Sequence, residues 1–131
     1  MNEEAPEKKI ITSFMDLHVW QEGHALVLAI YKVTRSFPKE ELFGLVSQIR
    51  RAAVSVTSNL AEGFGRQSYK EKAQFFFLSR GSLTETQNQL VISKDIGYLS
   101  TDEFTKLFAQ SIKVHKILTG LIKKTKSFIH S

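Results

Sequence analysis

The sequence predicts an all-α protein, an antiparallel up-down-up-down four-helix bundle. Apolar residues recur with helical spacing over long segments, no segment alternates as a strand does, and no Asn-Gly or Asp-Gly hairpin turn occurs. The two prolines, Pro6 and Pro38, interrupt none of these segments. A chain of 131 residues can bury a core of its own. We therefore expect a flexible N-terminal arm over residues 1–13 and one bundle domain over residues 14–131.

The first predicted helix runs from about Leu17 to Ser36. Asp16 precedes it as a plausible N-cap, because a carboxylate can accept a hydrogen bond from a free amide of the first turn. The Phe37-Pro38 dipeptide supplies the stop, since the residue before a proline avoids the helical conformation.

The second predicted helix begins near Glu40 or Leu42 and ends within residues 62–65. Its apolar positions follow the spacing of one helical face: Leu42, Leu45, Val46, Ile49, Ala53, Val56 and Leu60. Gly63 suits the left-handed position that follows many helices, with Phe64 packing back on the last turn.

Two capping boxes mark the remaining helices. The Ser68-x-x-Glu71 motif opens a third helix that continues to about Ile96, just before Gly97. The Ser100-x-x-Glu103 motif opens a fourth helix that runs toward Phe128.

Composition limits the classes of protein and partner. There is no cysteine, which excludes a disulfide scaffold, a thiol nucleophile and thiolate metal sites. No apolar run approaches 20 residues, and the first residues are polar and acidic, so we expect no membrane span, no secretory signal and a cytoplasmic location. Lys and Arg number 18 against 13 Asp and Glu, for a net charge of +5 and a pI near 9.5. This balance favours an anionic partner.

Lysines gather on one side of the fourth predicted helix and in its last turns. No Asp or Glu occurs from residue 104 to the end of the chain. Such a face can simply be solvated, and lysines near a helix C-terminus also complement its dipole. Because soluble surfaces usually mix charges, the one-sided pattern instead makes contact with a phosphate backbone a serious alternative. The candidate nucleic-acid-binding residues are Lys106, Lys113, Lys116, Lys123, Lys124 and Lys126.

The second predicted helix carries a separate polar face about 110° from its apolar face. Its members are Gln48, Ala52, Ser55, Asn59 and Glu62, with Arg51 at the margin. This face can be a wet edge of the bundle, a contact between helices or subunits, or a ligand site. A negative charge at the C-terminal end of a helix is unfavourable, so Glu62 needs a cation. We expect an ion pair with Arg51, Arg66 or Arg80.

The third predicted helix contains Phe75-Phe76-Phe77-Leu78. Four consecutive side chains point in four directions, so one internal face cannot bury them all. Because soluble monomers rarely expose so much apolar surface, we predict that Phe75, Phe76 and Phe77 contribute to a homo-oligomer interface. Stacking on nucleic-acid bases and a thick core are the alternatives.

No motif predicts catalysis or a cofactor. The sequence has no His-Glu-x-x-His motif, no Glu-x-x-His pair, no phosphate-binding loop and no nucleophile elbow. We expect no enzyme, no metal and no cofactor. The weaker alternative is a catalytic corner formed by Asn59, Glu62 and Arg66.

Several segments together resemble a known family. They are residues 14–21, Phe37-Pro38 with Glu41, residues 48–53, residues 55–63, and Gly81-Ser82-Leu83-x-Glu85. They are similar to the bacterial four-helix-bundle proteins encoded in intervening sequences of large-subunit ribosomal RNA genes, sometimes labelled S23 ribosomal proteins. The resemblance covers about residues 14–124. Thr86 departs from the apolar residue expected after Glu85.

The resemblance implies a four-helix protomer that assembles into a ring-like homopentamer without enzyme activity. The family is also similar to the accessory variability determinant of diversity-generating retroelements, a basic pentameric bundle that associates with a reverse transcriptase and its template RNA. RNA, or an RNA-handling enzyme, is the partner so implied. A purely structural protein-interaction scaffold is the alternative. The resemblance also implies an architectural polar network among helices or subunits. Within it we expect Arg51 or Arg80 to form a buried ion pair with Glu85. The members of the network are Gln48, Arg51, Ser55, Asn59, Glu62, Arg80, Ser82 and Glu85.

Overall fold

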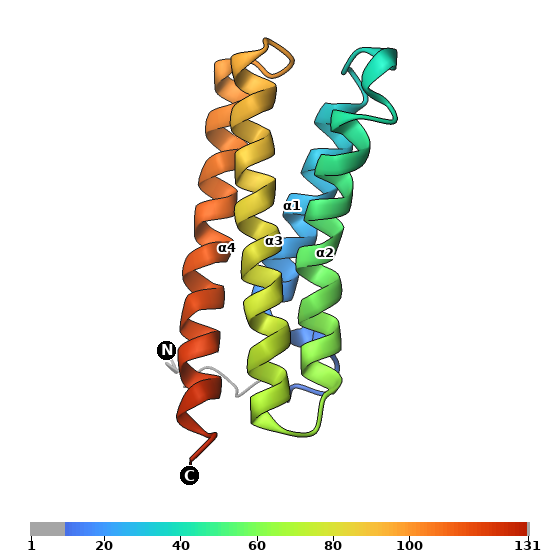
Figure 1. Cartoon of the computed structure of the whole chain (residues 1–131). Coiled ribbons are helices and arrows are strands. Elements are labelled where there is room, and N and C mark those ends of the chain that lie inside the picture. The colour runs from blue at the N-terminus through green and yellow to red at the C-terminus, as the bar shows by residue number, and fades with distance from the viewer. Residues whose placement is uncertain (1–9, 131) are drawn as a thin grey trace, which may run out of the picture.

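The computed structural model describes residues 10–130 and shows four long helices (Figure 1). They are α1 (His18–Thr34), α2 (Leu45–Gly65), α3 (Tyr69–Asp95) and α4 (Thr101–Ser127). Two short 3₁₀ turns, η1 (Phe14–Asp16) and η2 (Lys39–Glu41), precede α1 and α2. No strand occurs in the described residues, which confirms an all-helical chain with four helices. Most of the expected N-terminal arm, residues 1–9, lies outside the described residues, as does residue 131.

The four helices lie side by side along one long axis (Figure 1). The α1–α2 and α3–α4 connections lie at one end of the molecule and the α2–α3 connection at the other. Each helix packs beside its neighbours in sequence, and α1 also packs beside α4, whereas the diagonal pairs α1–α3 and α2–α4 lie farther apart. The most extensive contact joins α2 to α3.

The core runs along the axis between the helices and is built from aliphatic side chains. All four helices contribute fully buried residues to it, among them Leu26, Ile49, Leu83 and Val114. Thr86 also lies inside, and its hydroxyl donates to the carbonyl of Ser82 at 2.9 Å. A hydroxyl satisfied by its own helix explains how a polar residue fits where an apolar one was expected.

The start of α1 differs from the prediction. Leu17 occupies the N-cap position and no side chain caps α1. Asp16 instead belongs to η1, where its carboxylate accepts from the backbone amides of Thr12 and Ser13, both at 3.0 Å. These bonds fasten the last two residues of the predicted arm to the bundle domain.

The start of α2 also differs from the prediction. The helix begins at Leu45, after η2 and Gly44, whose backbone angles of −111° and −112° are not helical. Leu42 therefore lies outside α2 and is 49% exposed. The prediction that Leu42 belongs to the core face is wrong. The break in the helix at Gly44 means that Leu42 no longer lies on the same helical face as Val46 and Ile49.

Gly63 serves a purpose other than the one predicted. It lies inside α2, is buried and does not adopt a positive φ; among the described residues only Gly97 does, at 88°. A Cβ at Gly63 would stand 2.7 Å from Cε1 and 2.9 Å from Cδ1 of Phe76. The glycine is needed so that α2 and α3 can approach closely near their connection.

The two predicted caps of α3 and α4 are present. Ser100 and Glu103 form the complete capping box, with bonds of 3.0 and 3.1 Å. The Ser68 hydroxyl caps the amide of Glu71 at 3.1 Å, but the Glu71 carboxylate accepts from that hydroxyl instead of from the Ser68 amide. Tyr98, in the α3–α4 connection, donates its hydroxyl to Glu41 of the α1–α2 connection at 3.0 Å. This bond joins the two connections at that end of the bundle.

Candidate functional site

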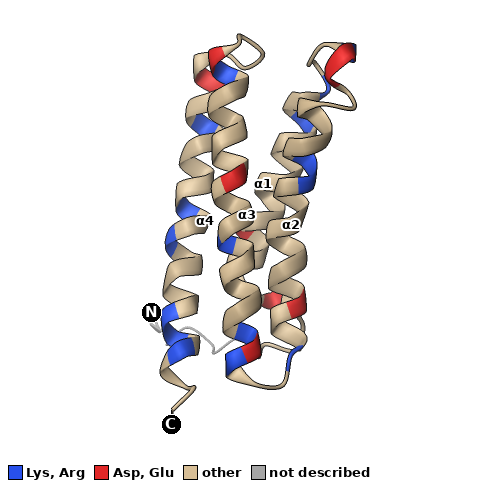
Figure 2. Cartoon of the chain, in the orientation of Figure 1, with Lys and Arg blue, Asp and Glu red and all other residues tan. Residues whose placement is uncertain are grey.

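All six candidate lysines of α4 are exposed, and we call them the lysine face: Lys106, Lys113, Lys116, Lys123, Lys124 and Lys126. Figure 2 shows basic residues along most of α4, with acidic residues only near its start. Lys113 is the one member that pairs with a carboxylate of a described residue, Glu22 of α1, at 2.5 Å. The other five have no described carboxylate within 4 Å. The lysine face is therefore largely uncompensated by local acidic groups.

The Lys113–Glu22 pair affects titration of the carboxyl. The hydrogen bond from Lys113 lowers the pKa of Glu22. The charges of Lys113 and His18 lower this pKa further, and partial desolvation opposes the shift.

The position of Lys126 shows how far the lysine face extends around α4, because its ammonium lies 5.2 Å from the centre of the Phe77 ring on α3. The lysine face thus extends from the α1 side of α4 to its α3 side.

The middle of the predicted polar network joins α2 to α3. The hydroxyls of Ser55 and Ser82 are 2.8 Å apart, and the Asn59 amide donates to the carbonyl and the hydroxyl of Ser55 at 2.8 and 3.1 Å. Ser79 donates to the carbonyl of Val56 at 2.7 Å. Small hydroxyl residues thus hold the two helices together at close range.

Glu62 finds one of its three predicted partners. Arg66 donates to Glu62 at 3.2 Å and lies 3.8 Å from Glu71. Its guanidinium also lies over the Phe75 ring, 4.6 Å from the centre. The pair is exposed, so it is a surface ion pair at the α2–α3 connection. Asn59, the third member of the suggested catalytic corner, is hydrogen-bonded to Ser55.

The predicted ion pair of Glu85 with Arg51 or Arg80 does not form within the chain. Arg80 points to the other side of α3, where it contacts Thr119 of α4 at 3.5 Å and the Phe77 ring. Glu85 is exposed, and within residues 10–130 its carboxylate accepts from the Gln89 amide alone, at 3.4 Å. Arg51 is exposed, and no described carboxylate lies within 4 Å of it. Gln48 is exposed as well.

The aromatic run on α3 divides among three environments. Phe76 is 3% exposed and belongs to the core of the single chain, which corrects its assignment to an oligomer interface. Phe75 is half-buried under Arg66, and Phe77 is 39% exposed between Arg80 and Lys126. Leu78, the next residue, is more exposed than any of them, at 57%. The solvent-facing apolar surface of α3 is therefore centred on Leu78 and not on the three phenylalanines.

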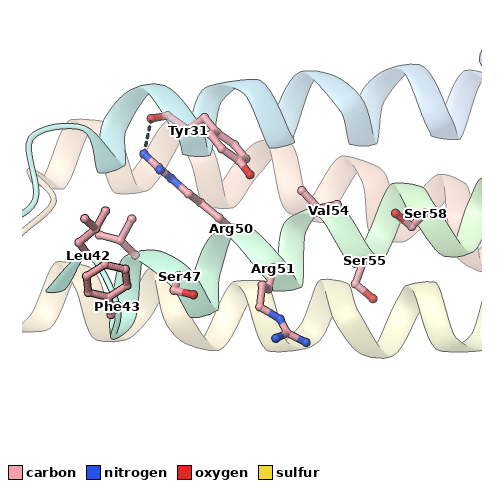
Figure 3. Close-up of a pocket in the computed structure, with 10 residues that line it drawn as sticks. Tyr31, Leu42, Phe43, Ser47, Arg50, Arg51, Val54, Ser55 and Ser58 are labelled. Atoms are coloured by element: carbon pink, nitrogen blue, oxygen red, sulfur yellow. Dashed lines mark hydrogen bonds between the residues drawn. The ribbon is translucent and has the colours of Figure 1, made fainter.

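An open groove of about 650 Å³ follows α2 on its α1 side (Figure 3). Arg50 turns toward α1, where it bonds to Thr34 at 3.0 Å and lies over the Tyr31 ring, 4.5 Å from its centre. Arg51 turns the opposite way, toward α3. At the end of the groove nearest the α1–α2 connection, Phe43 is 93% exposed.

Sequence reasoning missed this groove. The available signal was Leu42-Phe43, two apolar residues in the segment between Pro38 and the helix that follows. In residues 10–130, no three His, Asp or Glu side chains gather closely enough to hold a metal ion. No helix in that part of the chain is long and apolar enough to cross a membrane.

Comparison with known proteins places the chain among relatives. A sequence model of the family described as 23S rRNA-intervening sequence protein matches residues 15–120. No curated protein sequence matches the chain. Among solved structures, the chain is similar to a protein of unknown function from the S23 ribosomal protein family of Bacteroides thetaiotaomicron VPI-5482. The two share 20% identity at a TM-score of 0.75, over 80% of this chain and 95% of that one, a likeness that shows the fold. Since the family match spans most of the sequence, the chain belongs to the 23S rRNA-intervening sequence protein family.

Proposed function

We propose that this chain is a non-enzymatic, oligomeric binding protein whose lysine face contacts RNA or an RNA–protein complex, such as one containing a reverse transcriptase. The observation that carries the proposal is the chemistry of α4. Five exposed lysines without a described carboxylate partner lie on one helix whose last 24 residues contain no acidic residue. Ammonium groups at this density suit a phosphate backbone, which they contact without reading base sequence.

The proposed assembly is a ring-like homopentamer of protomers with helices in up-and-down order. A single copy leaves exposed Leu78 and Ile92 of α3, Ile96 at its C-cap and Phe43 of the α1–α2 connection, which supports self-association. A ring would repeat the lysine face once per copy and so strengthen its attraction for a polyanion.

The second candidate is a protein-interaction scaffold that binds no nucleic acid, in which the lysines only keep the protein soluble. The exposed apolar side chains of Phe43 and Leu78 favour it, because they suit a protein neighbour better than a phosphate backbone. The two candidates differ in their response to salt: phosphate contacts release counterions, so affinity for nucleic acid falls steeply as salt rises.

Fluorescence anisotropy with a labelled single-stranded RNA tests the proposal. Lys116, Lys123 and Lys124 are changed to Glu together; Lys113 is kept because it pairs with Glu22. The matched control changes three exposed lysines outside α4 to Glu, which alters net charge equally: Lys32, Lys39 and Lys70.

We expect salt-sensitive binding by the wild type, a loss of at least about tenfold in affinity for the α4 variant, and a smaller loss for the control. Equal losses in both variants would show that net charge alone, and not the lysine face, attracts the RNA. Absence of binding at low salt would contradict the proposal and favour the scaffold.

A further inference from the structure

We infer that the outer surfaces of α2 and α3 are the two complementary halves of one contact between copies of this chain, with Arg51 of one copy paired to Glu85 of the next. The inference rests on the proposed self-association and names the surfaces that perform it. Four observations carry it: an apolar groove, an apolar stripe, two opposite charges without an ion pair, and the level at which all of them lie.

The α2 half is a concave surface with a cation at its edge. The groove is lined by exposed apolar side chains, with Val54 37% exposed, Leu42 49% and Phe43 93%. Arg51 stands on the side of this groove that faces away from α1 (Figure 3). The groove therefore offers apolar area together with one positive charge.

The α3 half is a straight stripe on the side of the helix that faces away from the core. The stripe consists of Leu78, Glu85 and Ile92 of α3 and of Ile96 at its C-cap. Their spacing of seven, seven and four residues places them on one line along the helix. The three apolar members are 57%, 40% and 51% exposed. Gly81 lies on the same side, and a Cβ there would meet no atom within 4 Å, so a neighbour can approach closely.

The charges on the two halves are complementary. Arg51 has no described carboxylate within 4 Å, and Glu85 has no described cation within 4 Å. The Ser55–Ser82 contact and the Glu62–Arg66 pair, by comparison, are formed within the chain. The charges of Arg51 and Glu85 are left to be matched from outside.

The two halves also lie at the same level of the bundle. Ser55 and Ser82 are in contact, and α2 and α3 run in opposite directions from their connection (Figure 1). Counting from that contact, Glu85 lies level with residue 52, within one residue rise of about 1.5 Å from Arg51. By the same count Ile92 lies level with Leu45, close to Leu42 and Phe43.

This common level decides the kind of assembly. A rotation about an axis parallel to the helices, without any shift along it, brings Glu85 of one copy to Arg51 of the next and Ile92 to the groove. The two halves differ, so the contact is heterologous and makes a closed ring when the rotation closes. They lie on adjacent corners of the bundle, roughly 90° apart, which suits a ring of few copies. The α4 helix lies diagonally across the bundle from α2 and supplies none of the residues named for this contact.

Mixing of charge-reversal variants tests the inference. Arg51→Glu and Glu85→Arg are made separately, and native mass is measured by light scattering over a range of concentrations. Each variant alone places like charges in the contact, and we expect its assembly to dissociate at a protein concentration at least about tenfold higher than the wild type requires, with helix content unchanged by circular dichroism. An equimolar mixture then forms larger species than either variant alone, because position 51 of one variant and position 85 of the other carry opposite charges wherever unlike copies meet. A ring of five still holds at least one contact between like copies, so we expect partial restoration of assembly.

Two comparisons make the result specific. The control variant Lys32→Glu reverses an exposed charge on α1 and leaves the mass unchanged. The double variant Arg51→Glu/Glu85→Arg assembles by itself. If the double variant assembles but the mixture has no greater mass than either single variant, the pair forms within one chain and the inference is overturned. If both single variants assemble like an oligomeric wild type, the contact lies elsewhere while the proposed self-association stands. A monomeric wild type overturns both.

Discussion

Gly63 shows at the scale of one residue how close packing constrains the sequence. A methyl group there would overlap the Phe76 ring, with 2.7 Å to its nearest carbon. We predict that Gly63→Ala lowers the free energy of unfolding by about 1–3 kcal/mol, the usual cost of overpacking, measured by urea denaturation. Gly120→Ala is the matched control: a Cβ at this exposed position in α4 meets no atom within 4 Å, and we expect a gain of about 0.5–1 kcal/mol. Equal responses of both variants would contradict the close approach of α2 and α3.

The pair of Glu22 and Lys113 predicts a dependence of stability on pH. The folded pKa of Glu22 lies below its ordinary value of 4.5, chiefly because of the hydrogen bond from Lys113. The stability that the ionised Glu22 carboxylate contributes to the fold is therefore present above pH 4.5. It disappears as the pH falls through the folded pKa. A double-mutant cycle with Glu22→Gln and Lys113→Gln gives a coupling of about 0.2–1 kcal/mol at pH 7, as for exposed pairs. A coupling unchanged at pH 2 would show that the charge of Glu22 does not contribute.

Tyr98 predicts the opposite dependence at alkaline pH. The hydrogen bond to Glu41 raises the pKa of the Tyr98 hydroxyl, and desolvation and the charges of Glu41 and Glu40 add to this. Stability from this bond is present below pH 10 and disappears as the pH rises through the folded pKa. In a background of Tyr31→Phe and Tyr69→Phe, ultraviolet titration should show Tyr98 ionising above pH 10, and Glu41→Gln should lower that pKa. An unchanged pKa would mean that the two connections are not tied by this bond.

At the scale of the element, the four helices are predictable from the sequence because each carries a local signal. Apolar spacing and the Ser100-x-x-Glu103 box depend only on residues within one turn or a few turns. The ends of helices are less predictable where tertiary contact decides. Gly63 reads as a helix terminator, but the Phe76 ring on another helix is what requires it. Asp16 reads as a cap for α1, but it caps the preceding turn.

The candidate site is less predictable than the fold, because the partners of surface charges are set by the angle at which helices meet. The exposure of the lysine face follows from helical spacing alone, and the pairing of Glu62 with Arg66 from their separation of four residues. Arg80 and Glu85 lie five residues apart on α3, about 140° around the helix, so helical spacing alone separates them. The contact of Arg80 with Thr119 depends on how α3 packs against α4, which no local pattern records. The groove beside Phe43 depends on a break at Gly44 that the apolar pattern conceals.

At the scale of the whole molecule, self-association is expected to stabilise the fold by mass action. A contact that covers Phe43, Leu78 and Ile92 exists only between folded copies, so dilution should lower the unfolding temperature. We predict that the temperature measured by calorimetry rises with protein concentration for the wild type, and much less for Ile92→Asp. A temperature independent of concentration in both proteins would contradict an assembly that covers these residues.

The assembly proposed for this protein is an oligomer that presents a basic surface to nucleic acid. The most direct test is the native mass by light scattering, with and without nuclease treatment, while the ratio of absorbance at 260 and 280 nm is recorded. We predict a particle of five times the 14.9 kDa chain mass, carrying nucleic acid that nuclease removes without dissolving the ring. A particle of one chain mass, free of nucleic acid before any treatment, would contradict both the proposed oligomer and its binding to nucleic acid.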